Sequence, residues 1–212
     1  MAPSSSRRFL WVAAGVFVAT LAQLVVGTFA DDLPQFAGKG FGARLVAYPL
    51  LMLAVPAAWL LHSRRQDKNE QPPSAAFALV MAPFLVDVTG NTLDLYDRVS
   101  WWDDVNHLVN WFLLNAGLGL LLRNRATGWV LGLLVTGLGA LLAIVWELGE
   151  WYTFIRHGTE LSTAYEDTLG DQALGTVGAA LAGGLLARRS WGGHPVVGLR
   201  HQRRQGRRKH EV

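Results

Sequence analysis

Residues 101–122 read WWDDVNHLVNWFLLNAGLGLLL and decide the fold. The second half is an apolar run, whereas Asp103, Asp104, Asn106, His107 and Asn110 occupy the first turns. A mostly apolar stretch of about 20 residues spans the hydrocarbon core of a bilayer as a helix. Polar and charged side chains inside such a helix are costly, and they usually face a bundle interior or a water-filled cavity. The stretch therefore predicts a membrane helix with a polar stripe at one end.

Five further apolar blocks flank this helix, in a chain that is 51% hydrophobic and 17% charged. Lipid offers the backbone no hydrogen-bond partners, so each block is expected to be helical. We predict an all-α membrane protein, a polytopic bundle of six transmembrane helices at 9–30, 42–62, 75–95, 104–122, 127–150 and 171–187. Residues 1–188 would form the transmembrane domain, and 189–212 a basic, disordered cytoplasmic tail.

The first block has features of a secretory signal. Arg7 and Arg8 precede it, and Thr28-Phe29-Ala30 resembles a cleavage site. Its apolar part is longer than the ~7–15 residues of such a signal. We expect a retained helix, with cleavage as the alternative.

Basic residues give the orientation. All of the 19 except Lys39, Arg44, Arg98 and Arg156 fall on one side of the predicted helices. Cytoplasmic segments of membrane proteins are rich in Lys and Arg, so both termini are predicted to be cytoplasmic, in a bacterial inner membrane. The basic tail would be attracted to anionic membrane lipid, and we expect no nucleic-acid partner. The absence of cysteine excludes disulfides and thiolate metal sites.

Acidic residues are distributed in the opposite way. All of the 16 except Asp67, Glu70 and Glu211 fall in outer loops or outer helix halves. Asp and Glu contribute little to insertion topology. Their asymmetry therefore indicates a function on the outer side.

Many of these residues recur at helical spacing near the outer ends of four predicted helices. Positions three, four and seven apart share one helix face. The sets are Asp87, Asn91 and Asp94; Asp103, Asp104, His107 and Asn110; Glu147 and Glu150; and Glu166, Asp167 and Asp171, with Asp97 at the mouth. We predict that they converge on one acidic cavity that opens to the extracytoplasmic side.

A bound cation would stabilise this cavity, because crowded carboxylates repel one another unless they are protonated or neutralised. Carboxylates and imidazole without thiolate suit Mg²⁺, Mn²⁺, Ca²⁺, Zn²⁺ or iron. We predict a divalent metal cofactor whose ligands are Asp87, Asp104, His107, Glu147, Glu150 and Asp171. The polar cavity would also contain Asn91, Asp97, Asp103, Asn110 and Asp167.

Structural roles are the alternative for some of these carboxylates. Asp94 could pair with Arg98 one turn later. Asp171 could belong to a capping box in which Thr168 caps the last helix. Small residues, namely Gly128, Gly132, Gly175, Ala179 and Gly183, predict close helix packing.

The order "D…GN…YD…DD..H" and then "WE..E…YEDT..D…GT.G" over residues 85–180 resembles the uncharacterised bacterial YjdF-like inner-membrane protein family, and more distantly VanZ-like proteins. The resemblance implies the same membrane architecture, and it places the family motifs at Asp87, Asn91, Asp97, Asp104, His107, Glu147, Glu150, Asp167 and Asp171. It implies no activity.

Four functions fit the predicted cavity. The first is a metal-dependent hydrolase or transferase on lipid or lipid-linked phosphate at the outer leaflet, with Glu147 or Glu150 as the catalytic base. A diiron oxidoreductase would need Glu-x-x-His pairs, but Glu150 stands where His would be expected. A cation or proton transporter or channel, and a non-catalytic interaction subunit, are the further alternatives.

Overall fold

The computed structural model describes residues 5–30, 32–65, 71–126, 128–153, 155–157 and 163–191. These ranges are helical and contain no strand. The elements are α1 (Ser5–Phe29), α2 (Phe41–Arg65), α3 (Ser74–Thr92), α4 (Leu95–Arg98), α5 (Trp102–Leu122), α6 (Gly128–Thr153), the 3₁₀ turn η1 (Ile155–His157) and α7 (Ala164–Trp191). Most of the predicted basic tail, residues 192–212, lies outside the described residues.

Five helices of the described part are long and apolar enough to cross a membrane: α1, α2, α3, α5 and α6. The protein is therefore an all-α, multi-pass membrane protein, as predicted. The sixth predicted span, α7, does not reach that apolar content. Its first turns carry Glu166, Asp167 and Asp171, and its last turn carries Arg188 and Arg189.

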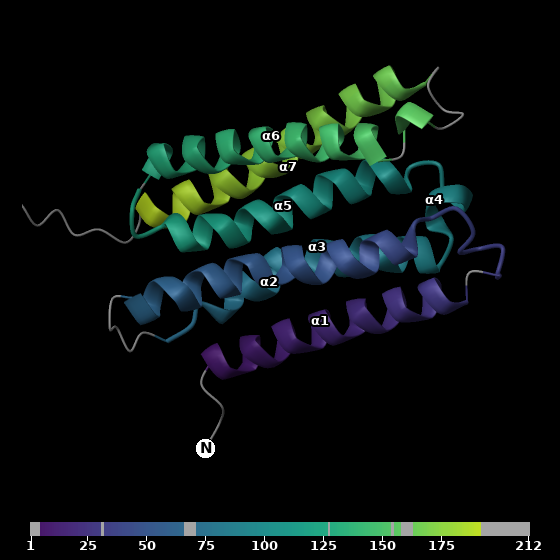
Figure 1. The fold of residues 1–212 in the computed structure, drawn as a ribbon. Coiled ribbons are helices and arrows are strands. Elements are labelled where there is room, and N and C mark those ends of the chain that lie inside the picture. The colour runs from purple at the N-terminus through teal and green to yellow at the C-terminus, as the bar shows by residue number, and fades with distance from the viewer. Residues whose placement is uncertain are drawn as a thin grey trace, which may run out of the picture.

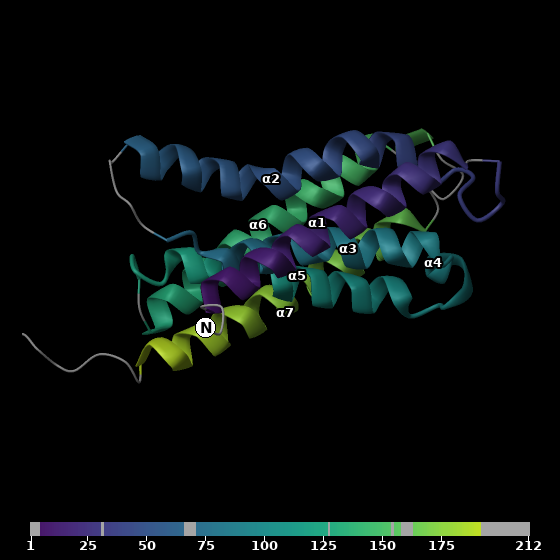
Figure 2. The same cartoon turned by 90° about the horizontal axis from the view of Figure 1, so that it is seen from below.

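The long helices run alternately in opposite directions (Figure 1). The C-terminal ends of α1, α3 and α6 and the N-terminal ends of α2, α5 and α7 therefore lie at the same end of the bundle. α7 packs closely against both α5 and α6, while α3 lies between α1 and α5. α2 lies at the edge of the bundle, beside α1 (Figure 2). All the predicted polar sets thus lie at one end.

Glycines allow the close contact of α7 with α5 and α6. A Cβ at Gly178 would overlap the Leu108 carbonyl oxygen and lie 3.0 Å from the Phe112 amide nitrogen, both in the α5 backbone. At Gly183 it would lie 2.6 Å from the Gly132 carbonyl oxygen of α6. The predicted small-residue packing is confirmed there. Gly128, however, has no neighbour at its Cβ position and begins α6 with a φ of 56°.

The end of α3 differs from the prediction, which continued the helix to residue 95. α3 ends at Thr92, and Asp94 adopts a left-handed conformation with φ 61°. Asp tolerates this region better than most residues with a side chain. The chain turns there into the short helix α4, and this turn brings Tyr96 back toward α3.

The start of α7 also differs from the prediction. The helix begins at Ala164, whereas residues 171–187 were expected. Asp171 consequently lies in the second turn, and Thr168 precedes it inside the helix. The capping-box interpretation of these two residues is wrong, and the side chain of Asp171 is available for another role.

Candidate functional site

A cavity of ≈600 Å³ occupies the end of the bundle where the polar sets meet. Residues of α2, α3, α5, α6 and α7 line it, together with the loop after α1 and the turn around α4. Pro83 and Leu114, near the middle of α3 and α5, are the deepest lining residues of those two helices. The cavity therefore reaches about halfway through the described bundle.

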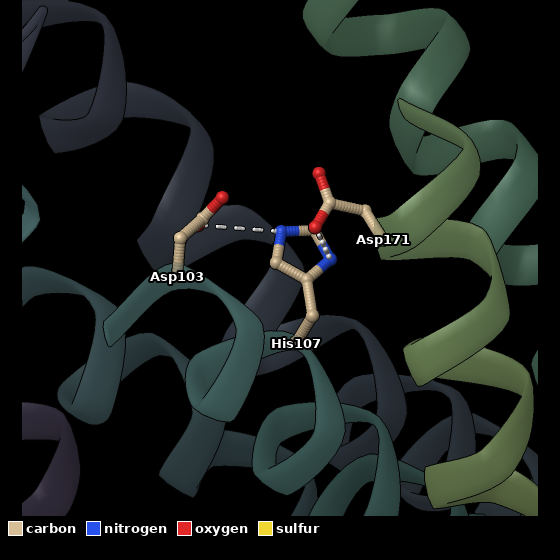
Figure 3. A group of neighbouring side chains, drawn as sticks. All are labelled: Asp103, His107 and Asp171. Atoms are coloured by element: carbon tan, nitrogen blue, oxygen red, sulfur yellow. Dashed lines mark ion pairs between the residues drawn. The ribbon is translucent and has the colours of Figure 1, made fainter. Parts of the chain in front are cut away.

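His107 lies at the centre of an acidic cluster (Figure 3). Its Nε2 atom is 3.7 Å from Asp103 Oδ1, four residues earlier on α5. Its Nδ1 atom is 3.7 Å from Asp171 Oδ1 of α7 and 3.9 Å from Glu147 Oε1 of α6. Three helices thus bring carboxylates to both nitrogens of one imidazole. We call His107, Asp103, Glu147, Glu150 and Asp171 the His107 cluster.

Two overlapping triads of the His107 cluster have the spacing of metal ligands. One ligand atom from each of Asp103, His107 and Asp171 lies within 4.8 Å of the others, and the same holds for His107, Glu147 and Glu150. His107, Glu147 and Asp171 are buried. Buried carboxylates and imidazole in this arrangement suit a divalent cation after small side-chain movements.

The Nδ1 atom of His107 gives independent support for a ligand. It is buried and has no hydrogen-bond partner, and the side chain is only 9% exposed. Both carboxylates beside it are too distant for a direct hydrogen bond. Buried polar atoms are rarely left unpaired. His107 Nδ1 is therefore an unsatisfied buried nitrogen that lies between the carboxylates of Glu147 and Asp171.

A second polar group, which we call the Asp87 network, lines the same cavity. Asp87 accepts hydrogen bonds from the hydroxyl groups of Tyr48 and Tyr96, the latter at 2.7 Å, and from Asn91 Nδ2 at 3.3 Å. Asn106 donates to the Tyr96 hydroxyl oxygen, and Asn110 donates to Asn106 Oδ1 at 2.7 Å. Neutral donors therefore stabilise the carboxylate of Asp87 without a metal. Burial, followed by the nearby charge of Asp87, raises the pKa of Tyr96 far above its usual range, so its hydroxyl group stays protonated.

The paired tryptophans at the start of α5 have different positions. Trp101 is 57% exposed, whereas Trp102 packs over Gly90 of α3 and meets the Tyr96 ring edge-to-face at 6.5 Å. A Cβ at Gly90 would overlap the Trp102 indole nitrogen. Gly90 is therefore required for the approach that fixes the start of α5 against α3.

A cluster of ion pairs lies at the exposed edge of the cavity, which we call its mouth. Lys39 Nζ lies 2.6 Å from Asp94 Oδ1 and 2.5 Å from Asp97 Oδ2, and Arg98 Nε lies 2.9 Å from Asp94 Oδ2. Burial lowers the pKa of Lys39, but hydrogen bonds to the two aspartates raise it overall. The hydrogen bond from Lys39 lowers the pKa of Asp94. The predicted Asp94–Arg98 pair is confirmed, and Lys39 is its additional partner.

The sequence-predicted site residues fall into three groups. His107, Glu147, Glu150 and Asp171 come together with Asp103 in the His107 cluster. Asp87, Asn91 and Asn110 belong to the Asp87 network. Asp97 and Asp167 line the cavity. Asp104 is exposed and is not part of the cavity lining, although it lies only three residues before His107 on α5.

The sequence reasoning missed the lining residues Lys39, Tyr48, Tyr96 and Trp146, and it did not assign Arg44 and Asn106 to the site. Arg44 and Tyr48 are four residues apart near the outer end of an otherwise apolar helix. The spacing rule that identified the other polar stripes would have found them. Tyr96 had no such signal, because its position depends on the left-handed turn at Asp94.

The comparisons with known proteins identify the family. The family model described as "Predicted membrane protein (DUF2238)" matches residues 9–191, and the chain belongs to this family. No curated protein and no solved structure matches the chain. The match includes all the helices that carry the cavity, and it supports membership of an uncharacterised membrane family.

Proposed function

We propose that the His107 cluster binds a divalent metal ion and that the protein is a metal-dependent hydrolase or transferase. The observation that carries this proposal is the buried, unpartnered Nδ1 atom of His107 beside two buried carboxylates. In this arrangement His107, Glu147 and Asp171 hold the ion. Asp103, which faces the other ring nitrogen, orients the imidazole as an outer partner.

The chemistry follows from the position of the ion beside a cavity. A bound divalent ion acts as a Lewis acid and lowers the pKa of a coordinated water. Glu150 lines the cavity and is therefore better placed than the buried Glu147 to remove a proton from that water. We assign Glu150 as the general base and Glu147 as a metal ligand. The substrates proposed are lipids or lipid-linked phosphates.

The topology that we propose has six membrane spans, with α7 as the sixth. α7 runs alongside α5 and α6 (Figure 1), so its polar residues face protein rather than lipid where they meet His107. Both termini would lie in the cytoplasm of a bacterium, and the cavity would open on the outer side of the inner membrane. We also propose that this membrane family is related to the YjdF-like proteins.

The depth of the cavity favours a reaction site over a transport path. Among the described residues, its lining stops near the middle of α3 and α5. Asn115, one residue beyond the lining residue Leu114, is fully buried, donates to the Trp111 carbonyl and packs against Gly139. Close packing at Asn115 therefore separates the cavity from the other end of the described bundle.

Elemental analysis of the detergent-purified protein tests the metal site. We expect one divalent ion per chain in the wild type and its loss in His107→Ala and Asp171→Asn. Asp104→Asn is the matched control, because Asp104 is an acidic residue of the same helix end that is exposed and lies outside the His107 cluster. It should retain the ion.

Phosphate release from a bacterial lipid extract then tests the reaction. The metal-loaded wild type should release phosphate or transfer it to another lipid, and Glu150→Gln should retain the ion but lose the activity. If the wild type holds no divalent ion, or if His107→Ala holds as much as the wild type, the proposed function is wrong.

A further inference from the structure

The cavity lining contains a second residue with a buried, unpartnered nitrogen, namely Arg44. Arg44 lies in the first turns of α2, one turn before Tyr48, and both side chains line the cavity. Its Nη1 atom is buried and has no hydrogen-bond partner. This unpartnered nitrogen belongs to a cation on α2, a helix that supplies no residue of the His107 cluster.

The other cations near the cavity either pair with carboxylates or lie outside its lining. Lys39 is held by Asp94 and Asp97, and Arg98 is paired with Asp94 at the exposed mouth. Arg156 lies over the Tyr152 ring, 3.6 Å from its centroid, and is not a lining residue. Arg44 is thus the lining cation of the described chain that lacks a carboxylate in direct contact.

The nearby carboxylates do not form an ion pair with Arg44. Asp87 and Glu150 attract it electrostatically, but within the part of the chain that the structure describes no carboxylate oxygen forms an ion pair with it. The oxygens of Asp87 already accept hydrogen bonds from two tyrosines and Asn91. A buried guanidinium donor without an acceptor is unfavourable, so an acceptor from outside the protein would stabilise it.

The cavity fits an anion with an apolar attachment. A guanidinium presents a planar fork of donors that matches phosphate oxygens. The ≈600 Å³ volume is in the range of small-molecule sites. Phe84, Trp111, Leu114 and Trp146 supply apolar wall on the same cavity.

We propose that Arg44 binds a phosphate monoester group of the substrate in the cavity that the His107 cluster also lines. The proposal rests on the proposed function, since it places the substrate's anionic group beside the proposed metal centre. A lipid headgroup and a soluble phosphate offer the same chemistry to Arg44. The experiment must therefore separate the two sources.

Binding is measured on the full chain in detergent, with and without Mn²⁺, by calorimetric titration with inorganic phosphate. In a second arm, the protein is exchanged into mixed micelles of phosphatidylcholine and phosphatidic acid, repurified, and its bound lipid quantified. Arg44→Gln removes the charge, Arg44→Lys keeps the charge without the fork, and Arg98→Gln is the control for an arginine at the mouth. Unfolding temperature and metal content are recorded for every variant.

We expect Arg44→Gln to weaken binding of phosphate or phosphatidic acid at least tenfold while metal content stays unchanged, and Arg98→Gln to bind as the wild type does. Arg44→Lys should bind with intermediate affinity, and it replaces Arg44→Gln if the latter does not fold. Retained phosphatidic acid identifies a lipid ligand, and phosphate binding alone identifies a soluble one.

Two results overturn the Arg44 site: a wild type that binds neither probe, and an Arg44→Gln variant that binds them equally well. A metal-loaded protein with either result retains the proposed metal centre. Conversely, Arg44-dependent phosphate binding by a protein that holds no metal supports the anion site and removes the metal centre. The two proposals therefore fail separately.

Discussion

Gly178→Ala is expected to separate α7 from α5 at the level of the candidate site. The added Cβ would overlap the Leu108 carbonyl oxygen and lie 3.0 Å from the Phe112 nitrogen. Both are backbone atoms of a packed helix, so neither can rotate away as a flexible side chain can. The helices must move apart, and Leu108 directly follows His107 in the sequence.

The size of the effect follows from two opposing contributions. Overpacking a well-packed interior costs about 1–3 kcal/mol, whereas replacing Gly by Ala within a helix contributes up to ~1 kcal/mol of stability. For a chain of this size, each kcal/mol corresponds to roughly 2–4 °C in the unfolding temperature. We expect Gly178→Ala to unfold several degrees below the wild type. We also expect it to lose metal, because α7 carries Asp171 away from His107.

Gly184→Ala is the matched control on the same helix. A Cβ there has no neighbour within 4 Å, so only the helix-propensity gain applies, and the unfolding temperature should equal or exceed that of the wild type. The assay is thermal unfolding in detergent, followed by tryptophan fluorescence, with elemental analysis of the same samples. Equal unfolding temperatures for Gly178→Ala and Gly184→Ala would refute the close contact between α5 and α7.

Three further predictions concern the Lys39–Asp94 ion pair, the Asp87 network and the membrane topology. Lys39 lowers the pKa of Asp94 from its ordinary value of 3.8. The contact therefore stabilises the folded state fully above pH 3.8, and this stabilisation is lost as the pH falls through the lowered pKa of the folded state. Asp94→Asn should therefore unfold earlier than the wild type at pH 7, and the difference should shrink in thermal scans below pH 4. Tyr48→Phe removes a hydrogen bond to a carboxylate and should cost about 1.5–3 kcal/mol if that carboxylate is ionised; an unchanged denaturation midpoint would contradict the assigned contact. In this cysteine-free chain, an impermeant maleimide applied to intact cells should label Ser100→Cys and not Asn124→Cys, whereas the reverse pattern would invert the proposed topology.

The helices themselves were predictable from the sequence, because in lipid the backbone must satisfy its hydrogen bonds within each apolar segment. The blocks at 9–30, 42–62, 104–122 and 127–150 correspond to α1, α2, α5 and α6 with small shifts at their ends. The break after Thr92 was not predictable in the same way. It depends on the left-handed conformation of Asp94, which apolar periodicity does not encode.

Convergence of the polar stripes was predictable, but the partners within the cavity were not. Helical spacing correctly joined Asp103 to His107 on one face of α5. It could not exclude Asp104, which is exposed and outside the cavity lining although it is three residues from His107 and so shares its helix face. It also could not separate Asp87 from the metal candidates, since one hydroxyl donor comes from α2 and the other from α4, which follows the unpredicted turn at Asp94.

The position of α7 has a consequence for biogenesis. This helix places Asp171 beside His107 of α5, and it is less apolar than the five helices that could cross a membrane by length and composition. A nascent chain that has released only α1 to α6 therefore has His107 and Glu147 in place without their last carboxylate partner. Arrival of α7 would complete the site and bury Asp171 in one step, which couples membrane integration of the last helix to maturation of the centre.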